Sequence, residues 1–208
     1  MEKKEEQRLT KMLEIENSLK SEGYKLICGI DEAGRGPLCG PVVAAAVILK
    51  DGVLIEGVND SKKLSEKKRE ELYDKIVKNA LAIGIGISDV DIIEKVNILN
   101  ATKLAMADAV KNLKINPDYV LIDGNQSVLQ ILFPQKTIVK GDSTSLSIAC
   151  ASIIAKVTRD RLLIAYDEKY PMYGFKKHKG YGTKMHIEAI KKYGLTDIHR
   201  PSFCKKFI

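Results

Sequence analysis

Long apolar segments are absent from the 208-residue sequence, and no stretch approaches the roughly 18 uncharged apolar residues that a membrane-spanning helix needs. The first 20 residues are charged throughout, whereas a secretory signal has an apolar centre. Internal repeats and low-complexity linkers are also missing, which argues against a repeat array or a string of domains. We therefore expect no membrane association, an N-terminal helical extension over residues 1–20, and one globular domain over residues 21–208.

Cysteine and histidine are scarce and show no regular spacing. The four cysteines form no CxxC pair and the three histidines are scattered, so no pattern typical of a zinc site occurs. Cys28 and Cys150 lie in runs of apolar or small residues, and we expect them to be buried thiols in a reducing, cytoplasmic environment. GxSxG and GxxxxGK[ST] are both absent, so the sequence predicts neither an α/β-hydrolase nucleophile nor a P-loop.

Basic residues exceed acidic ones by 34 to 27, which gives a net charge of +7. This excess favours a polyanionic partner, but many ordinary proteins share it, so a second signal is required. Residues 170–184, YPMYGFKKHKGYGTK, supply one because tyrosines alternate with lysines in a glycine-containing loop. This composition favours contact with a nucleic-acid backbone over a merely solubilising surface.

Hydrophobic periodicity predicts strands that alternate with helices, which is typical of an α/β protein with a mixed sheet. Gly84 and Gly86 lie within one predicted strand and indicate a close approach of another backbone. The predicted strands span residues 25–31, 41–49, 80–88, 119–123 and 136–140, with a candidate short edge strand at 53–56. The predicted helices span residues 66–79 with Ser65 as N-cap, 89–95, 97–113, 145–168 and 184–193.

Carboxylates follow the first predicted strand directly. The apolar run ends in Asp31 and Glu32, and glycines at 34, 36 and 40 follow in a turn. Ligand sites in α/β sheets usually lie at such strand ends. Successive strand residues point to opposite faces, so these two carboxylates can share one site only if the chain bends at Glu32.

Two further acids lie at the ends of predicted elements. Asp123 ends the strand YVLID, and Asp142 precedes the long helix that starts near residue 145. With Asp31 and Glu32 they form a set of four acids that are free to converge, and a cation would be needed to hold them together. Carboxylates without nitrogen or sulfur ligands favour Mg²⁺ or Mn²⁺. Two such ions are typical of phosphodiester hydrolysis.

Six motifs occur in order from about residue 24 to residue 204, and together they resemble the bacterial ribonuclease HII family. They are GIDEAGRGPLCGPVVAAAVI, NDSKKLS, LIDGN, VKGDSTSLSIACASIIAKVTRD, YPMYGFKKHKGYGTKMH and HRPSF. The resemblance implies a ribonuclease H-like mixed β-sheet flanked by helices, with a C-terminal helical portion. It also implies cleavage of the RNA strand of RNA/DNA hybrids, and of duplex DNA on the 5′ side of a single embedded ribonucleotide, with 3′-hydroxyl and 5′-phosphate products.

The family's metal-binding acids correspond to Asp31, Glu32, Asp123 and Asp142, which would hold two divalent ions in a protein that we expect to be monomeric. Its Gly-Arg-Gly loop corresponds to residues 34–36.

The resemblance further implies recognition of the ribose 2′-hydroxyl, which is both a donor and an acceptor. Backbone groups of Gly34, Arg35 and Gly36 can approach a sugar closely because glycine has no side chain. The family's substrate-sensing tyrosine corresponds to Tyr181, with Tyr173 as the competing placement, and we favour Tyr181.

Several charged residues admit two interpretations. Lys140 adjoins Asp142 and is the strongest lysine candidate for substrate contact, whereas phosphate contact by Lys62 or Lys63 is balanced against a solvated turn. For Arg35 we favour substrate contact over a surface ion pair. Two other residues are assigned structural roles: Asp160 an ion pair within its helix, beside Arg159, and His186 an orienting or packing role.

Three alternative functions remain to be distinguished. Ribonuclease HIII has a related core but typically carries a Gly-Thr-Gly loop and an added N-terminal domain, so Arg35 and the roughly 24 residues before the first strand argue against it. A catalytically inactive nucleic-acid-binding protein would not need all four acids. A strand-transfer nuclease of the same fold would need further segments, for which the chain has little room.

Overall fold

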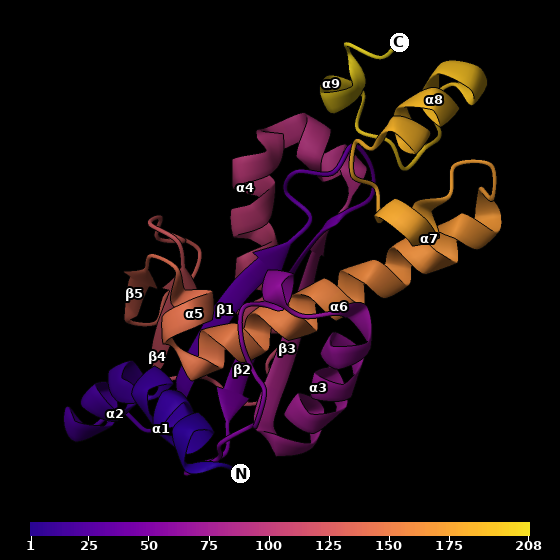
Figure 1. Ribbon diagram of the computed structural model, residues 1–208. Helices are drawn as coiled ribbons and strands as arrows, with labels where there is room; N and C mark the ends of the chain where they lie inside the picture. Colours follow the sequence, from indigo (N-terminus) through magenta and orange to yellow (C-terminus); the bar gives the residue numbers. More distant parts are fainter.

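The computed structural model describes all 208 residues and contains one mixed five-stranded sheet with helices on both faces (Figure 1). The strand order is β3-β2-β1-β4-β5. β1 is antiparallel to β2 and parallel to β4. The strands are β1 (Ile27–Ala33), β2 (Val42–Leu49), β3 (Ala80–Ser88), β4 (Tyr119–Asp123) and β5 (Gln135–Ile138). The predicted α/β class with a mixed sheet is confirmed.

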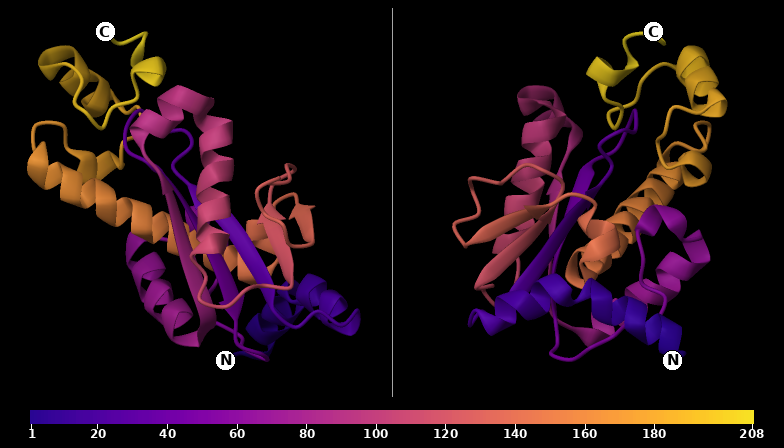
Figure 2. Two further views of the ribbon diagram at one scale, coloured as in Figure 1. Left: turned by 180° about the vertical axis from the view of Figure 1, so that it is seen from behind. Right: turned by 60° about the vertical axis from the view of Figure 1, so that its left-hand side comes forward.

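Helices of different length cover the two faces of the sheet (Figure 2). α4 (Val90–Lys111) packs on one face of β2 and β3, and α6 (Leu146–Lys169) packs on the other face against β1 and β2. α3 (Glu66–Asn79) lies beside α6, and Ser65 caps it as predicted, accepting a hydrogen bond from the Lys68 amide. The C-terminal helices lie beyond one end of the sheet (Figures 1 and 2), orange for α7 (Phe175–His178) and yellow for α8 (Lys184–Tyr193) and α9 (Pro201–Cys204).

Glycines allow the helices to approach the sheet closely. A methyl group at Gly86 would lie 1.9 Å from the carbonyl oxygen of Ala105 in α4, and one at Gly84 would lie 2.0 Å from that of Ala109. The predicted close approach at these two glycines is therefore confirmed. On the opposite face, a methyl group at Gly29 in β1 would lie 2.2 Å from the backbone carbon of Ser147 in α6. No side chain larger than hydrogen fits at these positions.

Asn97 separates the two helical segments that the sequence predicts over residues 89–113. Its φ of 66° is non-helical, so α4 contains a kink at this residue. The side chain of Asn97 accepts hydrogen bonds from the amides of Leu99 and Asn100 and thereby caps the second segment. Asp89 caps the first segment through the Ile92 amide.

The predicted edge strand at 53–56 is wrong. Its backbone forms local turns, with the Val53 amide bonded to Lys50 and the Val58 amide bonded to Ile55. The segment packs under the N-terminal helix instead of pairing with the sheet: the Glu5 carboxylate accepts from the Gly57 amide at 2.9 Å. β5, an edge strand of the sheet, ends at Ile138, which is two residues earlier than expected, and Lys140 adopts a left-handed conformation.

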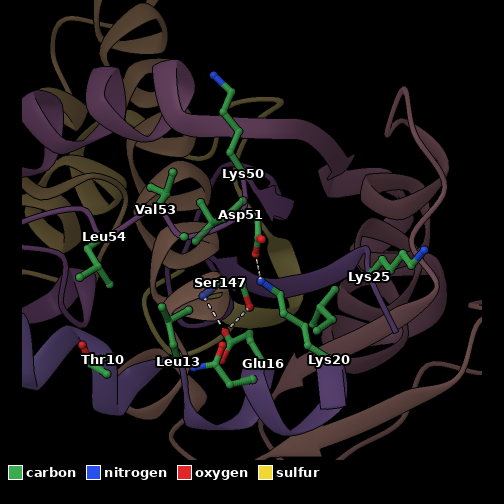
Figure 3. Close-up of a pocket in the computed structure, with 14 residues that line it drawn as sticks. Thr10, Leu13, Glu16, Lys20, Lys25, Lys50, Asp51, Val53, Leu54 and Ser147 are labelled. Atoms are coloured by element: carbon green, nitrogen blue, oxygen red, sulfur yellow. Dashed lines mark hydrogen bonds and ion pairs between the residues drawn. The ribbon is translucent and has the colours of Figure 1, made fainter. Parts of the chain in front are cut away.

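The N-terminal residues form two helices, α1 (Lys3–Met12) and α2 (Glu14–Ser21), with Leu13 between them. Glu16 of α2 is buried beside the start of α6. One of its oxygens, Oε1, accepts hydrogen bonds from the hydroxyls of Ser145 and Ser147, both at 2.7 Å, and from the Ser147 amide at 3.0 Å. Figure 3 shows Glu16 and Ser147 at the edge of a pocket that α1, α2 and the turn after β2 enclose. Glu16 therefore supplies a negative charge at the N-terminus of α6, where the helix dipole favours one.

Replacing Glu16 with Ala is expected to lower the free energy of unfolding by about 2 kcal/mol, because two buried hydroxyls and a helix-terminal amide lose their acceptor. Urea denaturation followed by circular dichroism measures this change. Glu14→Ala is the matched control, since it removes an exposed carboxylate from the same helix. Equal effects of the two substitutions would contradict the capping role of Glu16.

Candidate active site

Three of the four predicted acids meet at the end of the two central parallel strands. β1 and β4 pair as far as Ile30 and Ile122, and Asp31 and Asp123 follow immediately. Asp142 lies in α5 (Gly141–Thr144), the single helical turn that follows β5. Carboxylate oxygens of Asp31, Asp123 and Asp142 all lie within 4.8 Å of one another. Asp31 and Asp142, which are more than a hundred positions apart in the sequence, therefore belong to one acidic group.

Backbone contacts hold Asp142 next to Asp123. Oδ1 of Asp123 accepts hydrogen bonds from the amide of Gly141 at 2.7 Å and from the amide of Asp142 at 3.4 Å. A methyl group at Gly141 would lie 2.6 Å from Ile148 and 3.2 Å from this same carboxylate oxygen. Glycine at 141 therefore allows the turn of α5 to approach the end of β4.

Glu32 lies on the other side of β1. The expected bend at Glu32 does not occur, because β1 continues through Ala33 in regular register with Val43. Asp31 and Glu32 therefore point to opposite faces of the sheet. Glu32 shares a pocket with Asp123 and with residues of α4, and its carboxylate lies 3.4 Å from the guanidinium of Arg35. Asp123 belongs to both sets of acids: it shares a pocket with Glu32, and it lies within 4.8 Å of Asp31 and Asp142.

Burial and mutual repulsion make the acidic group costly without a counter-ion. Burial raises the pKa of Asp31 well above its usual range, and the carboxylates of Glu32 and Asp123 raise it further. Burial also raises the pKa of Asp142, and Asp123 adds to that effect. The pKa of Glu32 is raised by burial, against the opposing charge of Arg35. An all-oxygen set of this kind fits Mg²⁺ or Mn²⁺.

Tyr181 and the loop at residues 34–36 lie side by side. A methyl group at Gly36 would be 3.9 Å from Cε1 of Tyr181, whose side chain is 45% exposed. Tyr173 is only 3% exposed, its hydroxyl donates to the Gly194 carbonyl at 2.9 Å, and its ring stacks on Phe175. Of the two candidate tyrosines, Tyr181 is the one that is exposed near the loop.

The predicted basic contacts differ in their relation to the acids. Partial burial opposes the charge of Lys62, but the carboxylates of Asp31 and Asp142 outweigh it and raise the pKa of this lysine. Lys62 therefore faces the acidic group from the 3₁₀ turn η1 (Ser61–Lys63). Lys140 is exposed and its backbone adopts the left-handed conformation. Its side chain makes no ion pair within the protein.

Asp160 stays outside the acidic group, as expected. It forms ion pairs with Lys156 at 2.7 Å and with Arg69 at 3.6 Å. The interpretation as an intra-protein ion pair is confirmed, although Arg159, its neighbour in sequence, is not a partner: its guanidinium binds backbone carbonyls instead.

Cys39, His186 and His199 form a buried cluster that their separation in the sequence concealed. Burial lowers the pKa of each histidine to about 4, so both rings are neutral. Nδ1 of His186 donates to the Tyr181 carbonyl at 3.0 Å, and Nδ1 of His199 accepts from the amide of Thr196 at 2.9 Å. His199 Nε2 then donates to His186 Nε2 at 3.1 Å. Every ring nitrogen has a partner, so hydrogen bonds account for this cluster, and it supports the orienting role expected of His186.

No helix of the structure is both long enough and apolar enough to cross a membrane.

Comparison with known proteins identifies the family of the chain. The family model described as Ribonuclease HII matches residues 28–206. Ribonuclease HII of Ruminiclostridium cellulolyticum is 58% identical over 99% of this chain and 80% of its own length, and that of Acetivibrio thermocellus is 61% identical over the same shares. The crystal structure of ribonuclease H2 from Pyrococcus horikoshii superposes with a TM-score of 0.73 at 27% identity, covering 88% of this chain and 97% of the other. The chain therefore belongs to the ribonuclease HII family of endonucleases.

Proposed function

We propose that this protein cleaves the RNA strand of RNA/DNA hybrids and cuts duplex DNA on the 5′ side of single embedded ribonucleotides. The products would be a 3′-hydroxyl and a 5′-phosphate. The convergence of Asp31, Asp123 and Asp142 is the observation that supports this proposal most strongly, and Asp123 also shares a pocket with Arg35 of the loop at residues 34–36. This pocket is lined by the acids Glu32 and Asp123 together with Arg35 of the loop, so groups for hydrolysis and a group able to contact the substrate share one site.

Ribonucleases H depend on divalent metal ions, and the carboxylate oxygens of the acidic group are suitable ligands for such ions. Asp31, Asp123 and Asp142 would hold two such ions, and Glu32, which shares a pocket with Asp123, would join them from the other face of β1. When bound, Mg²⁺ or Mn²⁺ supplies the Lewis acidity for hydrolysis of a phosphodiester. Lys62 and Lys140 flank the acids and would contact phosphates of the nucleic acid.

The loop at residues 34–36 would recognise the ribose. None of the amide groups of Gly34, Arg35 and Gly36 donates a hydrogen bond within the protein. A 2′-hydroxyl can accept from such an amide, whereas deoxyribose offers no group at that position. The ring of Tyr181 would stack on the adjacent sugar, a contact that is indifferent to the base.

A labelled DNA duplex with a single ribonucleotide tests the proposed function, with an all-DNA duplex as control. We expect one cut on the 5′ side of the ribonucleotide in Mg²⁺ or Mn²⁺, and no cut with a chelator. Cleavage of a continuous hybrid without any cut at the single ribonucleotide would overturn the proposed substrate range. Tight binding without cleavage of either substrate would overturn the proposed catalysis.

Replacing Tyr181 with Ala is expected to slow cleavage at a single ribonucleotide on the order of tenfold or more, because a stacking contact is lost. Continuous hybrid should be affected less, since every position in it presents a ribose. Initial rates on the two substrates measure the difference. Tyr193→Ala is the control, because Tyr193 is similarly exposed on α8. A rate unchanged by Tyr181→Ala would exclude the stacking role.

A further inference from the structure

Two arginines are fully buried without a carboxylate partner. Arg159 lies in α6 and Arg200 immediately before α9, and each is 0% exposed. Neither forms an ion pair with any acid of the protein. An unpaired buried charge is costly unless hydrogen bonds satisfy it, so the partners of the two guanidinium groups explain how the fold tolerates them.

All partners of Arg200 are backbone carbonyls of one loop. Its Nη2 donates to the Gly34 carbonyl at 2.7 Å, and its Nη1 donates to the carbonyls of Arg35 at 3.1 Å and Pro37 at 2.9 Å. Its Nε and Nη2 both donate to the Gly40 carbonyl, at 3.0 and 2.7 Å. A single side chain from the C-terminal region therefore holds the loop from residue 34 to residue 40.

These contacts determine which way the loop amides point. In a planar trans peptide the carbonyl and the following amide point in opposite directions. Because the carbonyls of Gly34 and Arg35 point inward to Arg200, the amides of Arg35 and Gly36 point away from it. The protein provides no acceptor for either amide. Arg200 thus holds two donors toward the outer side of the loop.

Arg159 joins the same loop to the segment that carries Tyr181. Its Nε and Nη2 donate to the carbonyls of Pro41 at 3.0 Å and Cys39 at 2.9 Å, and its Nη1 donates to the Lys179 carbonyl at 2.9 Å. A methyl group at Gly34 would lie 2.1 Å from Arg159 Nε, so the guanidinium is packed directly against the loop. Tyr181 is two residues beyond Lys179, and its position relative to the loop depends on this bridge.

We propose that Arg159 and Arg200 are positioning residues for ribose recognition. Arg200 keeps the amides of Arg35 and Gly36 facing the substrate, and Arg159 sets the spacing between this loop and Tyr181. The proposal rests on the proposed function, because it assumes that the loop and Tyr181 recognise a ribonucleotide. Lysine cannot replace either residue, since its donors share one nitrogen and cannot span several carbonyls in a fixed plane.

Binding measurements without turnover test the role of Arg200. In an Asp31→Asn background, the dissociation constants for a duplex with one ribonucleotide and for the all-DNA duplex are compared before and after Arg200→Lys. We expect the preference for the ribonucleotide to fall about tenfold, the effect of losing a well-made hydrogen bond, with affinity for the all-DNA duplex unchanged. Arg161→Lys is the control, because Arg161 is on the exposed side of α6 and pairs with Glu70.

An unchanged preference in a folded Arg200→Lys protein would overturn the positioning role alone. Absence of any ribonucleotide preference in the Asp31→Asn parent, together with no cleavage by the wild type, would overturn the proposed function and this inference with it. Thermal melting separates loss of folding from loss of recognition, because a purely structural role would lower the melting temperature and leave the preference of the folded protein intact.

Arg159 provides a second test that does not depend on Arg200→Lys being folded. If Arg159 acts by placing Tyr181, then Arg159→Lys should reduce cleavage at a single ribonucleotide about tenfold in the wild type and much less in a Tyr181→Ala protein. Equal effects of Arg159→Lys in both backgrounds would overturn the coupling. Arg161→Lys, tested in the same two backgrounds, should have equal effects in both and therefore show no coupling to Tyr181.

Discussion

Replacing Asp31 with Asn is expected to reduce cleavage by on the order of 10³-fold or more, because the substitution removes a charged ligand from a site whose ions supply several kcal/mol of transition-state stabilisation. Asp31 is buried within 4.8 Å of Asp123 and Asp142, so no neighbouring oxygen can take its place without moving the ends of the strands. Binding of the ribonucleotide-containing duplex should remain measurable, since the loop at residues 34–36 is unchanged. Retained turnover in Mn²⁺ would refute the ligand role.

The same substitution should stabilise the metal-free protein. The pKa of Asp31 is raised above its ordinary value of 3.8, so the native state holds this proton more tightly than the unfolded state does. As pH rises through the raised pKa, ionisation lowers the free energy of unfolding. An asparagine side chain cannot ionise, so thermal melting of Asp31→Asn in chelator should show a higher melting temperature near neutral pH and a shallower decline with pH. Asp74→Asn, which removes an exposed carboxylate from α3, should change neither.

Replacing Gly29 with Ala is expected to destabilise the protein by on the order of 4 kcal/mol or more, a large part of the stability of a typical domain. The added methyl group would lie 2.2 Å from the backbone carbon of Ser147 and 2.3 Å from the amide nitrogen of Ile148. Backbone atoms cannot rotate away as a side chain can, and Glu16 holds this end of α6 in place. The clash of the added methyl group could be relieved only if β1 and α6 moved apart.

Urea denaturation measures this effect when the unfolding midpoints of Gly29→Ala and of the control Gly36→Ala are each compared with that of the wild type. Gly36 has an ordinary φ, and its nearest neighbour would be a tyrosine ring atom at 3.9 Å, so alanine at 36 should leave the unfolding midpoint nearly unchanged. A wild-type midpoint for Gly29→Ala would mean that α6 lies further from β1 in solution than in the structure.

Periodicity and turn chemistry are local properties, and they were sufficient for most elements. The apolar runs of β1, β2 and β4, the Ser65 cap, and the close approach at Gly84 and Gly86 are confirmed. At 53–56 local turns replace the predicted strand, because the Val53 amide bonds to Lys50 and the Val58 amide bonds to Ile55. Glu5, 52 residues earlier in the chain, accepts from the amide of Gly57 next to this segment. β5 also ends earlier than predicted, before the left-handed Lys140.

For the site, the sequence alone determined which chemistry was available. Four acids at the ends of elements, a glycine-rich turn with Arg35 and a loop of tyrosines and lysines predict a nuclease site, because residue type and position along an element can be seen without a fold. Only the tertiary structure decided how they are arranged. It placed Asp31 and Glu32 on opposite faces of a straight strand, with Asp123 between them.

The tertiary structure alone also decided the roles of Glu16, Arg159 and Arg200. Arg159 and Arg200 lie in two of the six motifs of the sequence, but neither these motifs nor the surroundings of Glu16 show that the charges are buried or which groups they bind. Their roles depend on partners more than a hundred residues away for Glu16 and Arg200, and up to 120 residues away for Arg159. Side-chain chemistry is therefore encoded locally in this protein, whereas the burial and the long-range backbone contacts that give these charges a function exist only once the sheet, α6 and the C-terminal helices have packed together.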